Sequence, residues 1–249
     1  MSRARKGNSD RRSKQGGKGM PNFWSYITGD TYAVGCTGQT VYVYDASGKE
    51  LARFKDIIYA YTPMFCPGQS MFVVKSTDGR LAVYSLDQMR LIKKFRYSKT
   101  DAGQDDGLCF SKDGKYFYNI ERHIPGYNSC LSIYETSGFH RVQQLFLSEP
   151  ALELDHIECD ADSGGLYVLG FMRDETGVFD YGFAAALESN QLTSITRIDF
   201  DRYLYIQGYK KLEIMGFTPK AKKWSILSYR GYDLEQLEHM KLSDLICAA

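Results

Sequence analysis

The sequence predicts an all-β protein assembled from a repeated unit of four short antiparallel strands. A central strand of the form apolar-x-apolar-Tyr-polar recurs at residues 41–45, 81–85 and 131–135. Each copy is followed by a turn and another strand, and the copies are spaced by roughly 40 to 50 residues. A lone hairpin cannot bury its own apolar face, so such units need neighbours. We expect these side chains to face the core: Val41, Val43, Leu81, Val83, Leu131 and Ile133.

The residues before each central strand supply the earlier strands of the unit. Three segments each place a strand end, a Gly-containing turn and an aromatic or β-branched strand in order: CPGQSMFVV (66–74), FSKDGKYFY (110–118) and CDADSGGLYV (159–168). Gly and Asp favour the backbone conformations that let one strand double back on the next. A weaker fourth copy spans 183–187 and 192–198, and a fifth is predicted at 203–207 and 212–217.

This repeat resembles a β-propeller of the broad WD40-like class over residues 23 to about 229, which implies about five blades of roughly 45 residues. The chain departs from standard WD40 repeats because their Gly-His and Trp-Asp dipeptides are absent. Neither Trp24 nor Trp224 is followed by Asp, and Gly does not precede His123, His140 or His156. The resemblance therefore concerns the superfamily and not a narrower family.

Three regions follow from this reading of the chain. Residues 21–232 are predicted to form the propeller, and residues 1–20 a disordered basic arm. Residues 233–249 depart from the strand pattern and are predicted to form a short C-terminal helical cap. Leu234, Leu237, Met240 and Leu245 share one face of that helix.

The basic arm contains seven Lys or Arg residues and one Asp, a net charge of +6. Its Gly-, Ser- and Lys-rich composition cannot bury enough apolar surface to offset the entropy of ordering. We expect contacts to nucleic acid or to an acidic partner from Arg3, Arg5, Lys6, Arg11 and Arg12. The alternatives are a solvated tail, or residues upstream of a true start at Met20. A basic run without interleaved aromatic side chains carries little specificity.

The sequence supplies no strong catalytic, cofactor or metal motif. His156 and Cys159 have a metal-like spacing, but no second pair completes a zinc site. Nucleophile-elbow, phosphate-loop and dinucleotide motifs are absent. The six cysteines are scattered singly and are expected to be reduced. Without an apolar run long enough to span a membrane or an apolar secretory core near the start, we expect a cytoplasmic protein.

Two classes of function remain open. The first is a non-enzymatic module that binds a protein partner through the two hairpins that lengthen the repeat, 121–129 and 173–181. Its predicted contact residues are Arg122, His123, Tyr127, Arg173 and Tyr181, because Arg and Tyr often carry the energy of an interface. The second is a carbohydrate-binding or glycoside-acting propeller, in which exposed rings stack on a glycan and carboxylates line the channel.

Overall fold

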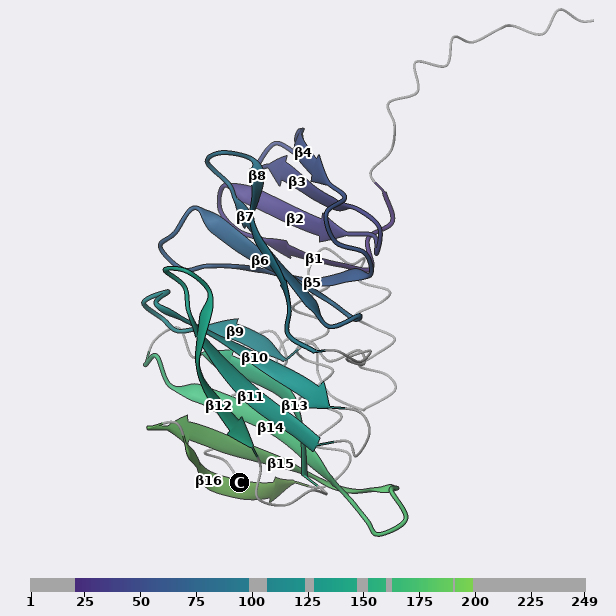
Figure 1. Ribbon diagram of the computed structural model, residues 1–249, viewed down its shortest axis with the longest axis vertical. Helices are drawn as coiled ribbons and strands as arrows, with labels where there is room; N and C mark the ends of the chain where they lie inside the picture. The colour runs from purple at the N-terminus through teal and green to yellow at the C-terminus, as the bar shows by residue number, and fades with distance from the viewer. Residues whose placement is uncertain are drawn as a thin grey trace, which may run out of the picture.

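The computed structural model describes residues 21–98, 107–123, 128–146, 152–159, 163–189 and 191–198. Within these ranges the structure contains strands and no helix, which confirms the all-β prediction. The strands form four antiparallel sheets of four strands each, and within every sheet they are hydrogen-bonded in chain order (Figure 1). The four-stranded unit predicted from the repeat is therefore present four times in the described residues.

The first sheet contains β1 (Ser25–Thr28), β2 (Tyr32–Cys36), β3 (Val41–Asp45) and β4 (Glu50–Phe54). The second contains β5 (Ala60–Phe65), β6 (Met71–Ser76), β7 (Arg80–Ser85) and β8 (Arg90–Arg96). The third contains β9 (Leu108–Phe110), β10 (Tyr116–His123), β11 (Asn128–Glu135) and β12 (His140–Phe146). The fourth contains β13 (Leu152–Cys159), β14 (Leu166–Arg173), β15 (Phe179–Glu188) and β16 (Gln191–Ile198). The predicted fifth unit, C-terminal helix and basic arm lie outside the described residues.

An apolar core fills the seam between each pair of successive sheets. The seam between the first and second sheets contains Val34, Val43, Phe72 and Tyr84. The opposite side of the second sheet packs on the third through Val73, Leu81, Val83, Phe117 and Tyr134. The third and fourth sheets share Ile120, Leu131, Ile133, Val168 and Phe183. Burial of apolar surface in these seams holds one sheet against the next.

All six side chains predicted to face the core are buried, from Val41 to Ile133. The intervening residues of the second sheet, Ala82 and Tyr84, are buried as well. This sheet lies between two others, so both of its faces pack and neither faces solvent. A strand buried on both sides reads as a continuous apolar run, which explains MFVV at 71–74 and LAVY at 81–84.

The two edges of each sheet differ. The first strands of neighbouring sheets contact each other, β1 against β5 and β9 against β13. The fourth strands, β4, β8, β12 and β16, form the opposite edges and are largely exposed. The first strands therefore lie innermost and the fourth strands outermost. Pro63 lies in β5, where its missing N–H is tolerated because β5 is an edge strand.

Each outer strand is interrupted by a register shift where it pairs with the third strand. In the first three sheets the shift inserts one extra residue into the outer strand. That residue is an exposed aliphatic side chain in every case: Leu51, Ile92 and Val142. A bulge twists the strand and breaks the row of free backbone groups, which protects an open edge from pairing with another chain.

Candidate functional site

The loops divide between two faces of the molecule. The turn face carries the loops that join the first strand to the second and the third strand to the fourth of each sheet. The hairpin face carries the loops that join the second strand to the third, and the connections from one sheet to the next. The alternation of antiparallel strands places every loop of one kind on the same side.

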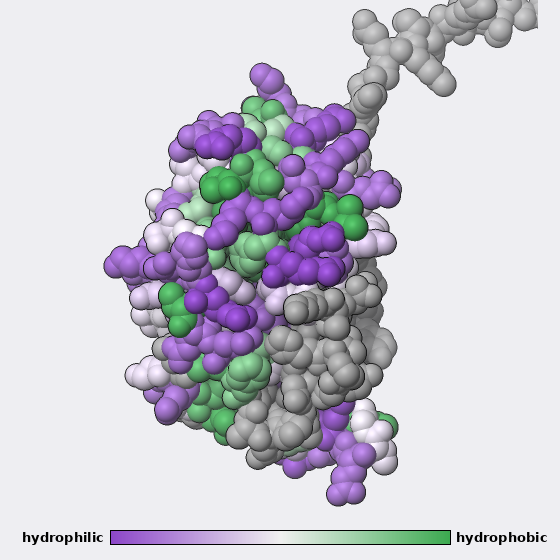
Figure 2. Space-filling model, in the orientation of Figure 1, coloured by the Kyte–Doolittle hydropathy of each residue, from purple (hydrophilic) through white to green (hydrophobic). Residues whose placement is uncertain are grey.

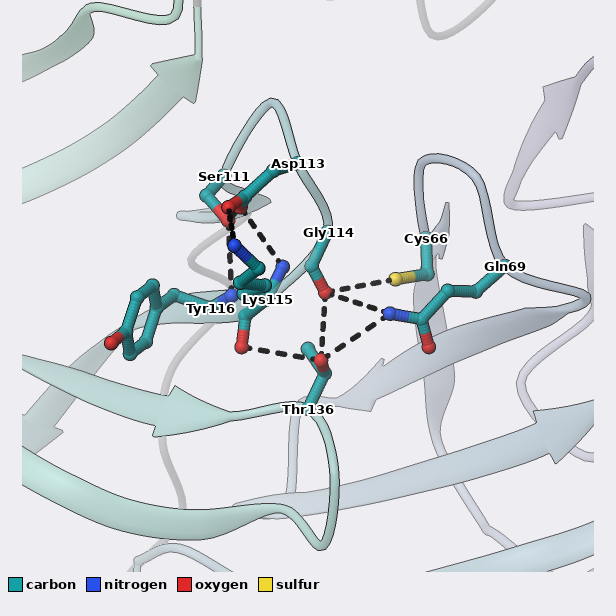
Figure 3. A network of polar contacts seen from close by, with 8 residues as sticks. All are labelled: Cys66, Gln69, Ser111, Asp113, Gly114, Lys115, Tyr116 and Thr136. Carbon is teal, nitrogen blue, oxygen red and sulfur yellow. Dashed lines mark hydrogen bonds and ion pairs between the residues drawn. The ribbon is translucent and has the colours of Figure 1, made fainter.

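The turn face is cross-linked between neighbouring sheets (Figure 3). The Gly114 carbonyl oxygen accepts hydrogen bonds from the Gln69 side-chain amide at 3.0 Å and the Thr136 hydroxyl at 2.7 Å. The Cys66 thiol lies 3.6 Å from the same oxygen. Gly114 has a φ of +68°, and a Cβ there would collide with the Pro67 carbonyl. These contacts join the second and third sheets.

Asp113 fixes the loop that presents Gly114. Its carboxylate accepts hydrogen bonds from the Ser111 hydroxyl and the Lys115 backbone N–H. These bonds, with the Ser111 hydroxyl contributing most, lower the pKa of Asp113 to about 2. The polar side chains of this face therefore hold loops in place.

Four of the predicted contact residues are described, and these lie toward the hairpin face. Arg122 and His123 end β10, where they pair with Ser129 and Asn128 of β11. Tyr127 lies outside the described residues. Arg122 and His123 thus lie at the tip of the third sheet, where β10 and β11 pair without a register shift.

Glu121, at the start of the same predicted hairpin, is buried in the third sheet. Its carboxylate accepts hydrogen bonds from the Tyr134 hydroxyl at 2.8 Å and the Asn119 amide at 3.3 Å. Burial, together with the nearby Glu121 charge, raises the pKa of Tyr134, which remains a hydrogen-bond donor. Glu121 therefore belongs to the interior of the sheet and not to a contact surface.

Arg173 is held within the fourth sheet. Its guanidinium donates to the Glu153 carboxylate at 2.5 Å and to the Gly177 carbonyl at 3.0 Å. It also lies 4.9 Å from the centre of the Phe171 ring. The Glu153 side chain is 1% exposed and that of Arg173 is 32% exposed. The Arg173 guanidinium therefore neutralises the buried Glu153 carboxylate, and part of the Arg173 side chain remains exposed to solvent.

Tyr181 lies on the same hairpin, where it pairs with Met172. The Arg197 guanidinium lies over its ring at 3.9 Å, and the same group is 3.7 Å from the Asp180 carboxylate. Arg173 and Tyr181 therefore belong to one hairpin, but each has its own partners.

The sequence did not reveal two exposed aromatic residues at the starts of β1 and β5, two of the four innermost strands. Trp24 directly precedes β1, and Tyr59 directly precedes β5. These two residues are 56% and 54% exposed, and the neighbouring Ile58 is also exposed. Gly38 joins them, because its absent side chain leaves room for the Trp24 ring and its carbonyl accepts the Ala60 N–H at 3.0 Å. We call Trp24, Ile58 and Tyr59 the aromatic corner.

Tyr59 adopts a φ of +53°, a conformation that bulky side chains rarely take. Three hydrogen bonds around it impose this backbone. The Tyr59 carbonyl accepts the Thr77 N–H, the Ile58 carbonyl accepts the Ser76 hydroxyl, and the Ala60 N–H reaches Gly38. The strained residue therefore presents its ring to solvent from a fixed backbone.

Within the described ranges, three other non-glycine residues have a positive φ: Met89, Phe139 and Ser189. All three lie in loops that join a third strand to a fourth. Phe139 is buried in a seam, and Met89 packs against another. Packing offsets the strain at Phe139 and Met89, whereas Ser189 and Tyr59 are exposed. Unrelieved strain of this kind is typical of functional positions.

Several cationic side chains lie near the Tyr59 end of the aromatic corner. Lys94 donates to the Asp56 carbonyl at 2.9 Å, within the loop that leads to Tyr59. Arg96 donates to the Asp78 carbonyl at 3.2 Å, in the hairpin next to the Tyr59 carbonyl. Arg80 pairs with the buried Asp78 carboxylate, and Lys55 is exposed. In the view of Figure 2, strongly hydrophilic side chains cover much of the surface over the first two sheets, with apolar patches between them.

No group of three or more His, Cys, Asp or Glu side chains that could hold a metal ion occurs in the described part of the chain. The same residues include no helix with the length and apolar character needed to cross a membrane. The five cysteines that the structure describes are free thiols. Burial raises the pKa of Cys66 and of Cys130 to about 12, so both stay protonated at neutral pH.

Comparison with known proteins gives a likeness of fold. No family model and no curated protein sequence matches the chain. Among solved structures it is similar to Kuenenia stuttgartiensis hydrazine synthase, with a TM-score of 0.56 and 13% identity over 69% of this chain and 51% of that one. The Neurospora crassa Pan2 WD40 domain gives a TM-score of 0.48 and 13% identity, over 72% and 52%. The chain thus spans about half the length of each.

At this identity the likeness to hydrazine synthase concerns the fold alone. Four successive four-stranded antiparallel sheets, packed on one another through buried seams, are the arrangement of β-propeller blades. The sheets are the blades predicted from the repeat.

Proposed function

We propose that this propeller is a non-enzymatic interaction module that binds a protein partner through its hairpin face. The supporting observation is the exposure of apolar and cationic side chains on that face. Val178 lies exposed at the tip of the hairpin between β14 and β15, and Phe146 is exposed at the end of β12. Apolar anchors beside Arg and Tyr are typical of the centres of protein interfaces.

The proposed contact residues are those of the two hairpins: Arg122, His123, Tyr127, Arg173 and Tyr181. Arg173 supports this role through its fixed geometry, because the bond to Glu153 restrains the guanidinium before any partner arrives. A restrained side chain loses less entropy on binding. We place the protein in the cytoplasm as part of this proposal, since free, buried thiols fit a reducing compartment.

The test is a quantitative pull-down from the native cell with a hairpin variant. Residues 174–178 and 124–127 are each replaced by Asn-Gly, a tight turn that leaves Arg173 and Glu153 in place. We expect the partners captured by the parent to be lost. The matched control is Tyr116→Ala, an exposed ring on the turn face, which should capture the same partners. An unchanged set of partners with the hairpin variant would contradict the proposal.

Carbohydrate recognition is the second candidate, and one observation favours it. The innermost strands carry half-buried rings and carboxylates: Tyr26 on β1, Tyr61 on β5, and Asp155 and Glu158 on β13. Rings and carboxylates near the axis are what a glycan site would use. Binding or hydrolysis of a glycan panel by the purified protein, abolished in Asp155→Asn and Glu158→Gln, is the expected result. A panel without response excludes this candidate.

A further inference from the structure

We infer that the aromatic corner is a binding site for single-stranded nucleic acid. This site is separate from the hairpins of the third and fourth sheets that carry the proposed protein-binding role. Bases would stack on the rings of Trp24 and Tyr59, and phosphates would be neutralised by the surrounding cations. Trp24 and Tyr59 are both exposed, and Gly38 contacts the Trp24 ring and the residue that follows Tyr59.

The first step concerns the rings. Gly38 contacts the Trp24 ring on one side, and its carbonyl binds the residue that follows Tyr59. Both residues are more than half exposed, so a flat ligand can approach them. Stacking of a base on an aromatic side chain is worth about 1–3 kcal/mol and tolerates any base. The two residues thus offer two stacking platforms on either side of Gly38.

The second step concerns the strain at Tyr59. A positive φ in a bulky residue lowers stability, and here no burial of the ring offsets it. The three hydrogen bonds around Tyr59 hold the ring outward in the absence of a ligand. The site is therefore preorganised, which reduces the entropy lost on binding.

The third step concerns charge. Lys55 lies on the loop that leads to Tyr59, and the side chains of Lys94 and Arg96, both on β8, reach that loop and the hairpin after β6. Residues 21–98 hold nine Lys or Arg and six Asp or Glu, whereas the remaining described residues hold six and ten. The positive charge thus collects on the two sheets that carry the aromatic corner. Phosphate groups complement it, and counterion release strengthens such binding at low salt.

The fourth step concerns the basic sequence at residues 1–20, which ends four residues before Trp24 and has a net charge of +6. That run lacks aromatic side chains of its own, and so by itself it carries little specificity. The aromatic corner supplies rings directly after it. Rings next to a basic segment are the combination that single-strand binders use, because a duplex hides the faces of its bases.

Fluorescence anisotropy of a labelled oligothymidylate of about 12 nucleotides tests the site. We expect the parent to bind it, and an unlabelled duplex of similar length to compete at least about tenfold less well. Trp24→Ala and Tyr59→Gly should each weaken binding about 5- to 100-fold. Tyr59→Gly also removes the strain, so the fold is retained. Tyr116→Ala is the matched control and should bind as the parent does.

Salt dependence separates the two contributions. Replacing Lys55 and Lys94 by Glu should reduce the slope of log affinity against log salt by about 0.7 per lost phosphate contact, while Trp24→Ala should leave the slope unchanged. In a Trp224→Phe background, the oligonucleotide should quench the fluorescence of Trp24. Binding that vanishes on deletion of residues 2–18 but ignores both ring substitutions would overturn the site. Failure to bind, or equal competition by an oligoglutamate peptide, would also overturn it.

Discussion

On the turn face, Phe139 adopts a positive φ and buries its ring in the seam between the second and third sheets. On the hairpin face, Tyr59 adopts nearly the same φ and leaves its ring exposed. The backbone cost is similar at both positions, but only Phe139 recovers it by packing. The comparison teaches that the same backbone geometry serves at Phe139 to hold two sheets together and at Tyr59 to display a side chain.

The largest expected effect is a difference in stability between the glycine variants of Phe139 and Tyr59. Phe139→Gly should lower the free energy of unfolding by about 3 kcal/mol, because the lost ring contacts exceed the relief of strain. Tyr59→Gly should leave it unchanged or raise it by up to about 1 kcal/mol. Denaturant unfolding of both variants measures the difference. Equal losses would break the comparison, because they would show that Tyr59 packs as Phe139 does.

A second effect concerns the close approach at Gly114. Gly114→Ala should cost about 2–3 kcal/mol, since the new Cβ adds a collision with the Pro67 carbonyl to the positive φ. The matched control is Gly68→Ala, whose φ is also positive but whose Cβ meets nothing within 4 Å. It should cost about 1 kcal/mol. Similar melting temperatures for the two variants would show that the loops around Gly114 yield easily.

A third effect concerns the stability contributed by Arg173, on the hairpin face. Arg173→Ala should cost about 2 kcal/mol, because it leaves the Glu153 carboxylate buried without its cation. This is less than for a fully buried pair, since the Arg173 side chain is partly exposed. Adding Glu153→Gln to Arg173→Ala should recover part of the loss in thermal unfolding. Without recovery, the arginine would act through its contact with Phe171 instead.

The smallest expected effect concerns pH on the turn face. The pKa of Asp113 is lowered from 3.8 to about 2, so the folded state favours its ionised form. The stabilisation it provides is present above about pH 4 and is lost as the pH falls toward 2. Asp113→Asn should therefore show a shallower loss of melting temperature over that interval than the parent. Identical profiles would mean that Asp113 does not hold the loop.

The sequence was sufficient for the blades because their signal is local. Leu81 and Val83 alternate within one strand, and the turn residues that follow them are close in the chain, so the repeat could be recognised without any contact. The burial of Ala82 on the opposite face was missed, because it depends on the neighbouring sheet.

The aromatic corner could not be predicted for the same physical reason. The φ of Tyr59 is set by partners at Gly38, Ser76 and Thr77, which are distant in the sequence. The bond from Arg173 to Glu153 also joins residues on different strands, so the sequence showed an arginine on a hairpin but not its partner. Local patterns predict strands, whereas exposure and pairing arise from the assembled sheets.

The bulges at Leu51, Ile92 and Val142 occupy equivalent positions in three successive outer strands. A chain that lengthens by duplicating such a unit copies the interruption together with the strand. Each added unit then arrives with an edge that already resists joining the edge of another molecule. Growth of the protein by whole units therefore need not increase its tendency to form fibres.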